Sequence, residues 1–470
     1  MNRTSSRTTL IKHGTVVTAS DEFTADVFIE GETIALIGAN LDGTNCNRVI
    51  DARGKYILPG GVDVHTHLDT PGGNGYCTAD DYFTGHRAAA FGGTTTVLSF
   101  ADQWHGASMR QTLDEWHSKA RGKAAVDYGF HLMVTDCTDA VVQELAHFRE
   151  WGVNTVKLMM AYKGRVMVDD GVIFRVMQRC KELGLLTMVH CENGEAIDVL
   201  QRQAVLDGNT SPIFHALTRP PQLEAEATER AIQLARAAGG APLFVVHCTH
   251  EGALAAVSRA RSRGEAVWCE TCIHYLYFTK EKLKGKRGNT FDGAKYVCSP
   301  PLREETDIAA LWHGLAHGEL HSVSTDHCPW RFDVHKSLGR EDFTKIPNGA
   351  PAIEERLMML WDGGVNTGRI TPSQFVGLAC TEPARLFGMQ NKGSIAVGKD
   401  ADIVVWDPKA RHTIRAKTNH GAMDYSLFEG TTVTGKPVKV FSRGELIVDG
   451  SRWLGEAGRG QFLERSDKPN

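Results

Sequence analysis

The stretch that decides the fold is GVDVHTH, residues 61–67, an apolar run that ends in two histidines separated by one residue. Runs that are apolar almost throughout are typical of strands buried on both faces, as in parallel sheets. Seven further runs of this kind follow along the chain: TTTVLSF (94–100), DYGFHLMV (127–134), TVKLMM (155–160), LLTMVH (185–190), LFVVH (243–247), VWCETC (267–272) and HSVSTD (321–326). The sequence therefore predicts eight buried strands.

Helix-like stretches separate most of these strands, for example residues 139–152, 172–184 and 224–240. The last two place apolar side chains three and four residues apart and end at glycine, a usual helix stop. Strands that alternate with helices in this way predict an α/β fold of the (β/α)₈ TIM-barrel type. A doubly wound open sheet is the alternative, but no Gly-rich phosphate-binding loop follows the first strand, which favours the barrel.

The two ends of the chain have a different pattern of apolar and turn-forming residues. Short apolar runs broken by turn residues fill the amino-terminal part, and the same pattern returns at residues 393–407 and 438–450. Short strands with glycine between them are typical of a small antiparallel sheet. We expect the two ends to pair into one domain, with the rest of the chain inserted between them.

Composition and charge exclude several classes of protein. The 470 residues carry 52 Lys+Arg against 56 Asp+Glu, so the chain lacks the cationic surface that binding to nucleic acid or anionic lipid requires. No apolar run approaches the ~18 residues of a membrane span, and the first residues lack the apolar core of a signal peptide. Eleven cysteines without a framework spacing indicate reduced thiols. We expect a cytoplasmic protein with no nucleic-acid or membrane partner.

Several of the predicted strands end in side chains that bind metals. Since the active sites of barrels lie at the carboxyl ends of the strands, we expect these side chains to meet at one mouth. Imidazole nitrogens and carboxylate oxygens suit zinc and similar divalent ions. A single strand-end histidine is more often a hydrogen-bonded core residue, but the shared position at one end of the strands favours a metal centre. The residues concerned are His65, His67, His190, His247 and Asp326.

Lys157, in the fourth predicted strand, is unusual because it is flanked by apolar residues. A buried ammonium is costly unless it is paired, and it has no lone pair for a metal ion. Two interpretations remain open at this point. The lysine either pairs with an aspartate or glutamate at the barrel mouth, or it reacts with carbon dioxide to form a carboxylate-like ligand that bridges two metals. Burial that lowers the lysine pKa favours the second interpretation.

Further motifs extend the pattern over most of the chain. In order, they are GGVDVHTHLDTP (60–71), VKLMMAYKG (156–164), MVHCENGE (188–195), VVHCTH (245–250), ETCIHYLYF (270–278), AKYVCSPPLR (294–303), STDHCPW (324–330) and IPNGAPAIEERL (346–357). Together they resemble the cyclic amidohydrolases, specifically the D-hydantoinase/dihydropyrimidinase branch of the amidohydrolase superfamily. The likeness runs from roughly residue 10 to residue 450.

The resemblance implies a domain arrangement that agrees with the texture of the sequence. Residues 1–57 and 391–450 would form a β-sandwich built from both termini, and residues 58–390 the TIM barrel. The polar, Gly-rich residues 451–470 would form a C-terminal tail that contacts neighbouring subunits, since the family tends to form homotetramers.

The resemblance also implies two divalent metal ions per subunit, which would be zinc, with manganese as the alternative. Six side chains would hold them: His65, His67 and Asp326 for the first metal, His190 and His247 for the second, and N6-carboxylated Lys157 as the bridge.

The implied activity is the hydrolytic ring opening of small cyclic amides, namely hydantoins, 5-substituted hydantoins or dihydropyrimidines, to N-carbamoyl amino acids. A hydroxide held between the two metals would be the nucleophile. Tyr162 would polarise the scissile carbonyl, and Asp326 would pass the proton of the nucleophile to the leaving ring nitrogen. Ser299 and Asn348 match positions whose main chains read the amide and carbonyl groups of the ring.

Two departures from the family leave the preferred substrate open. No arginine follows His67 before Arg87, which disfavours substrates that need a carboxylate clamp there. Residues 70–73 and Met159 replace bulky apolar residues that line the pocket in relatives. Hydrolysis of another cyclic amide, such as allantoin or an imide, is therefore an alternative. A non-catalytic scaffold like the dihydropyrimidinase-related proteins is the other, and it is disfavoured because all six metal-ligand positions are present.

Overall fold

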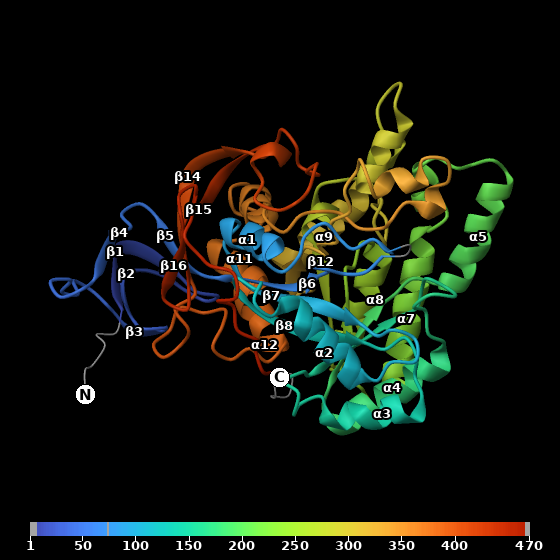
Figure 1. The fold of residues 1–470 in the computed structure, drawn as a ribbon, viewed down its shortest axis with the longest axis horizontal. Coiled ribbons are helices and arrows are strands. Elements are labelled where there is room, and N and C mark those ends of the chain that lie inside the picture. Colours follow the sequence, from blue (N-terminus) through green and yellow to red (C-terminus); the bar gives the residue numbers. More distant parts are fainter. Residues whose placement is uncertain (1–6, 73–74, 466–470) are drawn as a thin grey trace.

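The barrel consists of eight parallel strands, each paired with the next one along the chain. The computed structural model describes residues 7–72 and 75–465 (Figure 1). Thr66, which ends the first barrel strand, and His327, three residues after the last one, form a parallel bridge that brings the two edges of the sheet together. The eight predicted strands and the TIM barrel are confirmed. The strands are β6 (Gly61–Thr66), β7 (Thr94–Asp102), β8 (Asp127–Met133), β9 (Thr155–Met159), β10 (Leu186–His190), β11 (Leu243–Val245), β12 (Val267–Cys272) and β13 (Ser322–Ser324).

Helices surround the barrel strands (Figure 1). None of those in the described part of the chain is both long enough and apolar enough to cross a membrane. The helices are α1 (Thr84–Phe91), α2 (Met109–Ala120), α3 (Asp139–Glu144), α4 (Asp170–Leu183), α5 (Gly194–Leu206), α6 (Ile213–Leu217), α7 (Pro221–Ala237), α8 (Glu251–Ser262), α9 (Glu305–Ala316), α10 (Arg356–Leu360), α11 (Pro372–Val376) and α12 (Glu382–Leu386).

Helix α4 shows how local sequence sets an element. The Asp169 side chain accepts a hydrogen bond from the Val172 N–H at its start, and Gly184 ends it with a left-handed φ of 68°. Its apolar stripe is buried against the barrel. The helix predicted over residues 139–152 is shorter than expected, because α3 ends at Glu144 and a 3₁₀ turn follows.

The two ends of the chain share one nine-stranded sheet beside the barrel (Figure 1). Strand β14 pairs with β5, which joins the two termini, and apolar side chains from both ends form one core. The sheet is not purely antiparallel as expected, because residues 39–47 return the chain to the end where β1 begins, so β4 and β5 run parallel to β1. The strands are β1 (Thr8–Val17), β2 (Glu22–Glu30), β3 (Thr33–Gly38), β4 (Arg48–Asp51), β5 (Tyr56–Pro59), β14 (Ile403–Thr413), β15 (Thr432–Ser442), β16 (Glu445–Asp449) and β17 (Arg452–Trp453).

A buried ion network joins this sheet to the amino-terminal end of the barrel. Lys392 Nζ lies 2.6 Å from Asp127 at the start of β8 and 2.9 Å from Asp402. Arg443 reaches the same Asp127 carboxylate at 3.0 Å. Each charge in the network therefore has an opposite charge beside it.

The described part of the C-terminal tail crosses this end of its own barrel. Tyr128 in β8 forms a parallel bridge with Phe462, and the Leu463 N–H donates to the Tyr128 carbonyl at 2.7 Å. Arg465 is fully buried there. That residues 451–470 also contact other subunits stays a prediction.

Candidate metal centre

The carboxyl ends of the barrel strands surround a cavity of about 770 Å³. Two of the predicted ligands lie within β6 and β9, one ends β10, and the others follow β6, β11 and β13 by one or two residues. Side chains far apart in sequence therefore converge at one mouth, as the strand pattern predicted. The cavity lining includes all six predicted metal ligands: His65, His67, Lys157, His190, His247 and Asp326.

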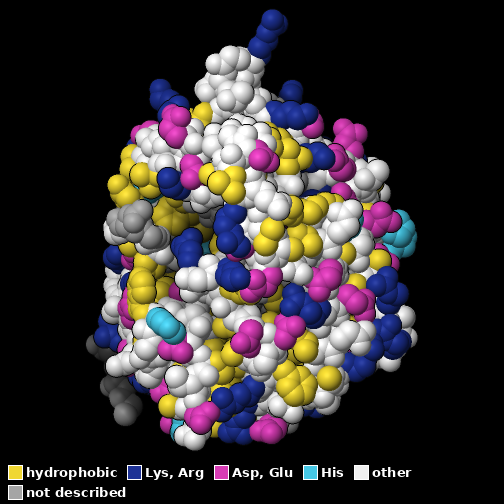
Figure 2. All heavy atoms as spheres, turned by 90° about the vertical axis from the view of Figure 1, so that its right-hand side faces the viewer, with side chains coloured by type: hydrophobic (Ala, Val, Ile, Leu, Met, Phe, Trp, Pro, Cys, Tyr) yellow, Lys and Arg dark blue, Asp and Glu magenta, His cyan; other side chains and the backbone are white. Residues whose placement is uncertain are grey.

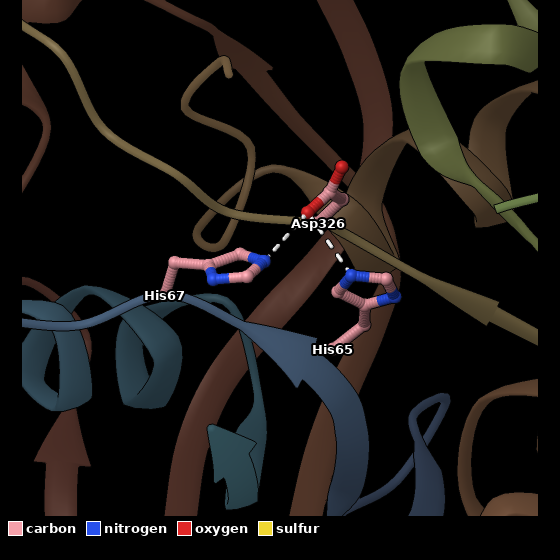
Figure 3. A group of neighbouring side chains, drawn as sticks. All are labelled: His65, His67 and Asp326. Atoms are coloured by element: carbon pink, nitrogen blue, oxygen red, sulfur yellow. Dashed lines mark ion pairs between the residues drawn. The ribbon is translucent and has the colours of Figure 1, made fainter. Parts of the chain in front are cut away.

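His65, His67 and Asp326 form the first group of ligand atoms (Figure 3). The Nε2 atoms of the two histidines lie 3.1 and 3.2 Å from Asp326 Oδ1, and the three ligand atoms are all within 4.8 Å of one another. Burial alone would lower the pKa of His65, but the carboxylates of Asp326 and Glu270 raise it to about 9. Such a cluster has the spacing and the donor types of a divalent metal site.

His190 and His247 form the second group, with His190 Nδ1 only 2.9 Å from His247 Nε2. The other ring nitrogen of His190 lies 2.9 Å from Glu192 Oε2. This carboxylate is acceptor-only, so His190 carries its proton on Nε2 and turns the Nδ1 lone pair toward His247. Burial holds the pKa of His247 well below its usual value, so this imidazole is neutral.

Glu270 orients His65 in the same way, although the sequence analysis did not identify it. Its side chain is fully buried in β12, lies 2.5 Å from His65 Nδ1 and accepts a hydrogen bond from Ser324. It therefore leaves His65 Nε2 free to face Asp326. The signal that could have found it is a charged residue inside an apolar strand, the same signal that singled out Lys157.

The Lys157 ammonium is buried among these ligands without a partner. Its Nζ has no hydrogen bond and no ion pair to any described residue, and it lies 5.0 Å from the centre of the Phe100 ring. Burial lowers its pKa to about 8, although the carboxylates of Asp326 and Glu270 favour the charged form. The ion-paired lysine that we considered is therefore absent from the described part of the chain.

The residues present fit a metal centre. His247 Nδ1 and Lys157 Nζ are buried polar atoms without hydrogen-bond partners among the described residues. Such atoms are costly in a folded protein, and beside other metal-type ligands a bound ion is one way to satisfy them. Neutral imidazoles and a carboxylate are the donors that zinc and related ions prefer.

Tyr162, Ser299 and Asn348 meet beside the metal ligands. The Asn348 side-chain amide donates to the Tyr162 hydroxyl at 3.2 Å and to Ser299 Oγ at 3.1 Å. Burial raises the pKa of Tyr162, so its hydroxyl keeps its proton and can donate it in a hydrogen bond. These contacts join side chains, and the expectation that the main chains of Ser299 and Asn348 read the substrate stays a prediction.

Three site residues adopt a left-handed backbone that ordinary residues avoid. Tyr162, His247 and Asp326 have φ of 69°, 41° and 47°. They are three of the seven non-glycine residues with positive φ in the described part of the chain. Such conformations gather at functional sites, where the surrounding structure fixes side-chain direction at the cost of local strain.

The cavity lining combines polar and apolar side chains, and its rim carries exposed cations. Tyr76, Met159 and Trp330 line the wall, and a Cβ added at Gly72 would lie 2.7 Å from the Trp330 ring. Gly72 therefore makes room for Trp330, whereas Gly73 lies outside the described residues. Lys163, Arg165 and Lys345 complete the lining at the surface. Lysine and arginine side chains also surround a hollow in the face that Figure 2 shows.

Comparisons with known proteins agree with this geometry. The model of the amidohydrolase family matches residues 56–447. D-hydantoinase from Geobacillus stearothermophilus is 49% identical over 461 residues, which cover 98% of this chain and 97% of the relative. D-hydantoinase from Ralstonia pickettii is 48% identical over 457 residues, with 97% and 98% covered.

A solved structure shows the same fold. The crystal structure of dihydropyrimidinase from Brevibacillus agri has a TM-score of 0.95 and 48% identity to this chain, and the match covers 97% of this chain and 98% of that one. The barrel, the group of ligand atoms at its mouth and the match over residues 56–447 agree, and the chain belongs to the amidohydrolase family.

Proposed function

We propose that the protein hydrolyses one ring amide bond of hydantoins, 5-substituted hydantoins or dihydropyrimidines and releases N-carbamoyl amino acids. One observation carries this proposal: the six metal-ligand side chains line a single cavity together with Tyr162, Ser299 and Asn348. Relatives about 48% identical over nearly the whole chain are D-hydantoinases, which supports the same substrate class. All ligand positions are present, which speaks against a non-catalytic scaffold.

Two divalent ions would complete the site, zinc in the first instance and manganese as the alternative. His65, His67 and Asp326 would hold one ion, and His190 and His247 the other. When bound, such ions polarise a carbonyl and make a water molecule lose its proton near neutral pH.

We further propose that Lys157 is carboxylated and is the ligand shared by both ions. Its Nζ lone pair attacks the carbon of carbon dioxide, a C–N bond forms as one C=O electron pair moves to oxygen, and one N–H proton leaves to water. The product is a carbamate on Lys157. Its oxygen atoms can bind metal ions, and they replace an amine that has no partner among the described residues. This anionic product would also remove the cost of burying an unpaired ammonium beside two cations.

Tyr162 and Asp326 would move and hold protons during hydrolysis. The Tyr162 hydroxyl, held by Asn348, donates a hydrogen bond to the carbonyl oxygen as negative charge develops on it. One Asp326 oxygen faces both histidines and the other points away from them (Figure 3). Asp326 takes a proton from the attacking water as the C–O bond forms, and delivers it to the leaving ring nitrogen as the C–N bond then breaks.

The cavity wall favours hydantoins with an aromatic or apolar 5-substituent. Tyr76, Met159 and Trp330 would contact that substituent, and burial of apolar surface would bind it. The polar ureido group of allantoin gains nothing from this wall, so allantoin is the weaker candidate.

The test is ring opening by the metal-loaded protein with dihydrouracil, hydantoin, 5-phenylhydantoin and allantoin as substrates. We expect turnover of the hydantoins and dihydrouracil, with the highest kcat/KM for 5-phenylhydantoin. Absence of turnover on all four after reconstitution with zinc or manganese and bicarbonate would contradict the proposed function.

We also propose that the protein works as a homotetramer in the cytoplasm. All eleven cysteines are free, and seven of them are buried, which agrees with a reducing compartment. Light scattering of the purified protein measures the oligomeric state, and a monomer would contradict the tetramer.

A further inference from the structure

Lys336 is a fully buried lysine with no carboxylate partner among the described residues, yet its ammonium is saturated. Its Nζ donates three hydrogen bonds to main-chain carbonyls, at 2.8 Å to Val297, 2.7 Å to Pro347 and 2.7 Å to Gly349. An ammonium has three N–H donors, so the cradle of carbonyls uses all of them. Three carbonyl oxygens therefore surround the Lys336 ammonium as they would surround a small bound cation.

The three carbonyls belong to the two segments that carry the proposed substrate-binding residues. Val297 lies two residues before Ser299, and Pro347 and Gly349 flank Asn348 on both sides. The Gly349 N–H donates to the Val297 carbonyl at 3.0 Å, so the segments touch where Lys336 joins them. One buried cation therefore contacts both segments and helps to hold Ser299 and Asn348 at their observed distance.

The distance between Ser299 and Asn348 affects the side chains that would contact the substrate. Asn348 uses its side-chain amide to reach both Ser299 Oγ and the Tyr162 hydroxyl. Its own carbonyl is also held, by the Trp330 indole N–H at 3.0 Å. A shift of the Asn348 segment would therefore displace the Tyr162 hydroxyl from its direction toward the cavity.

We propose that Lys336 is a positioning residue that holds the Ser299 and Asn348 segments in the register needed to bind the ring and to aim Tyr162. This inference rests on the proposed function. Both segments lie outside the regular strands and helices at these residues. The three hydrogen bonds of the ammonium therefore reinforce the Gly349–Val297 main-chain bond and the Asn348–Ser299 side-chain bond. Removing it leaves the Pro347 and Gly349 carbonyls without this donor, whereas the Val297 carbonyl keeps the Gly349 N–H.

The test replaces Lys336 by methionine, which keeps the length of the side chain and removes its donors. We expect normal metal content and a kcat/KM for 5-phenylhydantoin that falls about 100-fold, because charge-assisted hydrogen bonds to the two segments are lost. Lys336→Gln, which keeps one donor group, should recover part of that loss. If Lys336→Met does not fold, Lys336→Gln is compared with the wild type instead, and we expect a smaller fall in kcat/KM.

A double-mutant cycle separates positioning from general stability. If Lys336 acts through Asn348, Lys336→Gln should lower kcat/KM far less in an Asn348→Ala background than in the wild type. Equal effects in both backgrounds would overturn the proposal. Lys392→Met is the matched control, a buried lysine far from the cavity, and should leave kcat/KM per folded subunit unchanged.

The outcomes keep this proposal apart from the proposed function. A wild-type protein that opens none of the rings contradicts the function itself. An active wild type whose Lys336 variants keep the full kcat/KM contradicts the positioning role alone.

Discussion

Two clusters of buried ionisable side chains lie at opposite ends of the barrel, and they are satisfied in different ways. In the base cluster, Lys392, Asp127, Asp402 and Arg443 pair with one another at 2.6–3.0 Å. In the mouth cluster, formed by the six metal-ligand side chains, Lys157 Nζ has no partner among the described residues. Both clusters are buried, so burial alone does not separate structure from function.

The pKa values of the two lysines express this difference. Burial lowers the pKa of both, but at the base three carboxylates outweigh it and raise the pKa of Lys392. At the mouth the carboxylates of Asp326 and Glu270 do not outweigh it, and the pKa of Lys157 falls to about 8. Removing one partner of a paired buried charge costs stability, whereas a buried charge without partners is a candidate for completion by a ligand or a reaction.

The largest expected effect follows from Lys157→Ala, which removes the unpaired amine. We expect kcat/KM to fall roughly 1,000-fold or more, because a catalytic unit that acts together fails when one member is removed. The thermal midpoint of the metal-free protein should stay within a few degrees of the wild type, since this amine has no partner to lose. Steady-state kinetics and thermal unfolding in chelator measure both. A fully active Lys157→Ala variant would contradict a catalytic role for Lys157 and would leave it only a structural role, like that of Lys392.

Lys392→Met is the counterpart at the base. It should lower the free energy of unfolding by about 3–5 kcal/mol, because Asp127 and Asp402 are left buried with less compensation. Activity per folded, metal-loaded subunit should not change. Urea unfolding beside active-site titration measures the two quantities. Unchanged stability with lost turnover would reverse the roles of the two clusters.

Tyr162→Phe tests the mouth without touching a metal ligand. Removing the hydroxyl should lower kcat about 100-fold with little change in KM, because its hydrogen bond strengthens as the carbonyl oxygen gains charge. Tyr277→Phe is the matched control, a tyrosine whose hydroxyl donates to the Met359 carbonyl outside the cavity lining. Its kcat should match the wild type. A Tyr162→Phe enzyme with normal kcat would exclude the hydroxyl from catalysis.

Glu355 sharpens the comparison because it is buried and accepts hydrogen bonds from the neutral side chains of Asn419 and Ser426. Burial, together with the nearby Glu354, raises its pKa from 4.5 to about 7. The folded state therefore holds this proton more tightly than the unfolded chain, so the contribution to stability is complete below about pH 4.5 and is lost as the pH rises through 7.

Glu355→Gln should remove this dependence. Relative to the variant, the wild type should lose on the order of 1–3 kcal/mol of stability between pH 4.5 and pH 8. Unfolding of both proteins across this range measures the difference. Parallel pH profiles would show that Glu355 titrates normally in the folded state.

The fold was predictable because each barrel strand is an apolar run of the length that a buried strand needs. The convergence of the ligands was predictable for the same reason, since each polar exception lies near the carboxyl end of a run. The direction of β4 and β5 was not, because it depends on where the loop of residues 39–47 returns the chain. That loop has no periodic pattern to read.

The residues that contact the site residues were harder to predict from the sequence. Glu270 lies 205 positions from His65, and Lys336 donates to a carbonyl 39 positions before it and to two that follow it. Such pairs are fixed by tertiary packing, which a single sequence does not report. Glu270 still had a local signal, a charge within an apolar strand, whereas Lys336 lies in a polar stretch of the sequence where a lysine is ordinary.

The most direct measurement of the central claim is ¹³C NMR of holoenzyme prepared with ¹³C-bicarbonate, paired with metal analysis of the same sample. We expect about two metal ions per subunit, as in other two-metal hydrolytic sites, together with one carbamate carbon that is absent from Lys157→Ala. Active, metal-loaded enzyme without a carbamate signal would contradict the bridging role of Lys157.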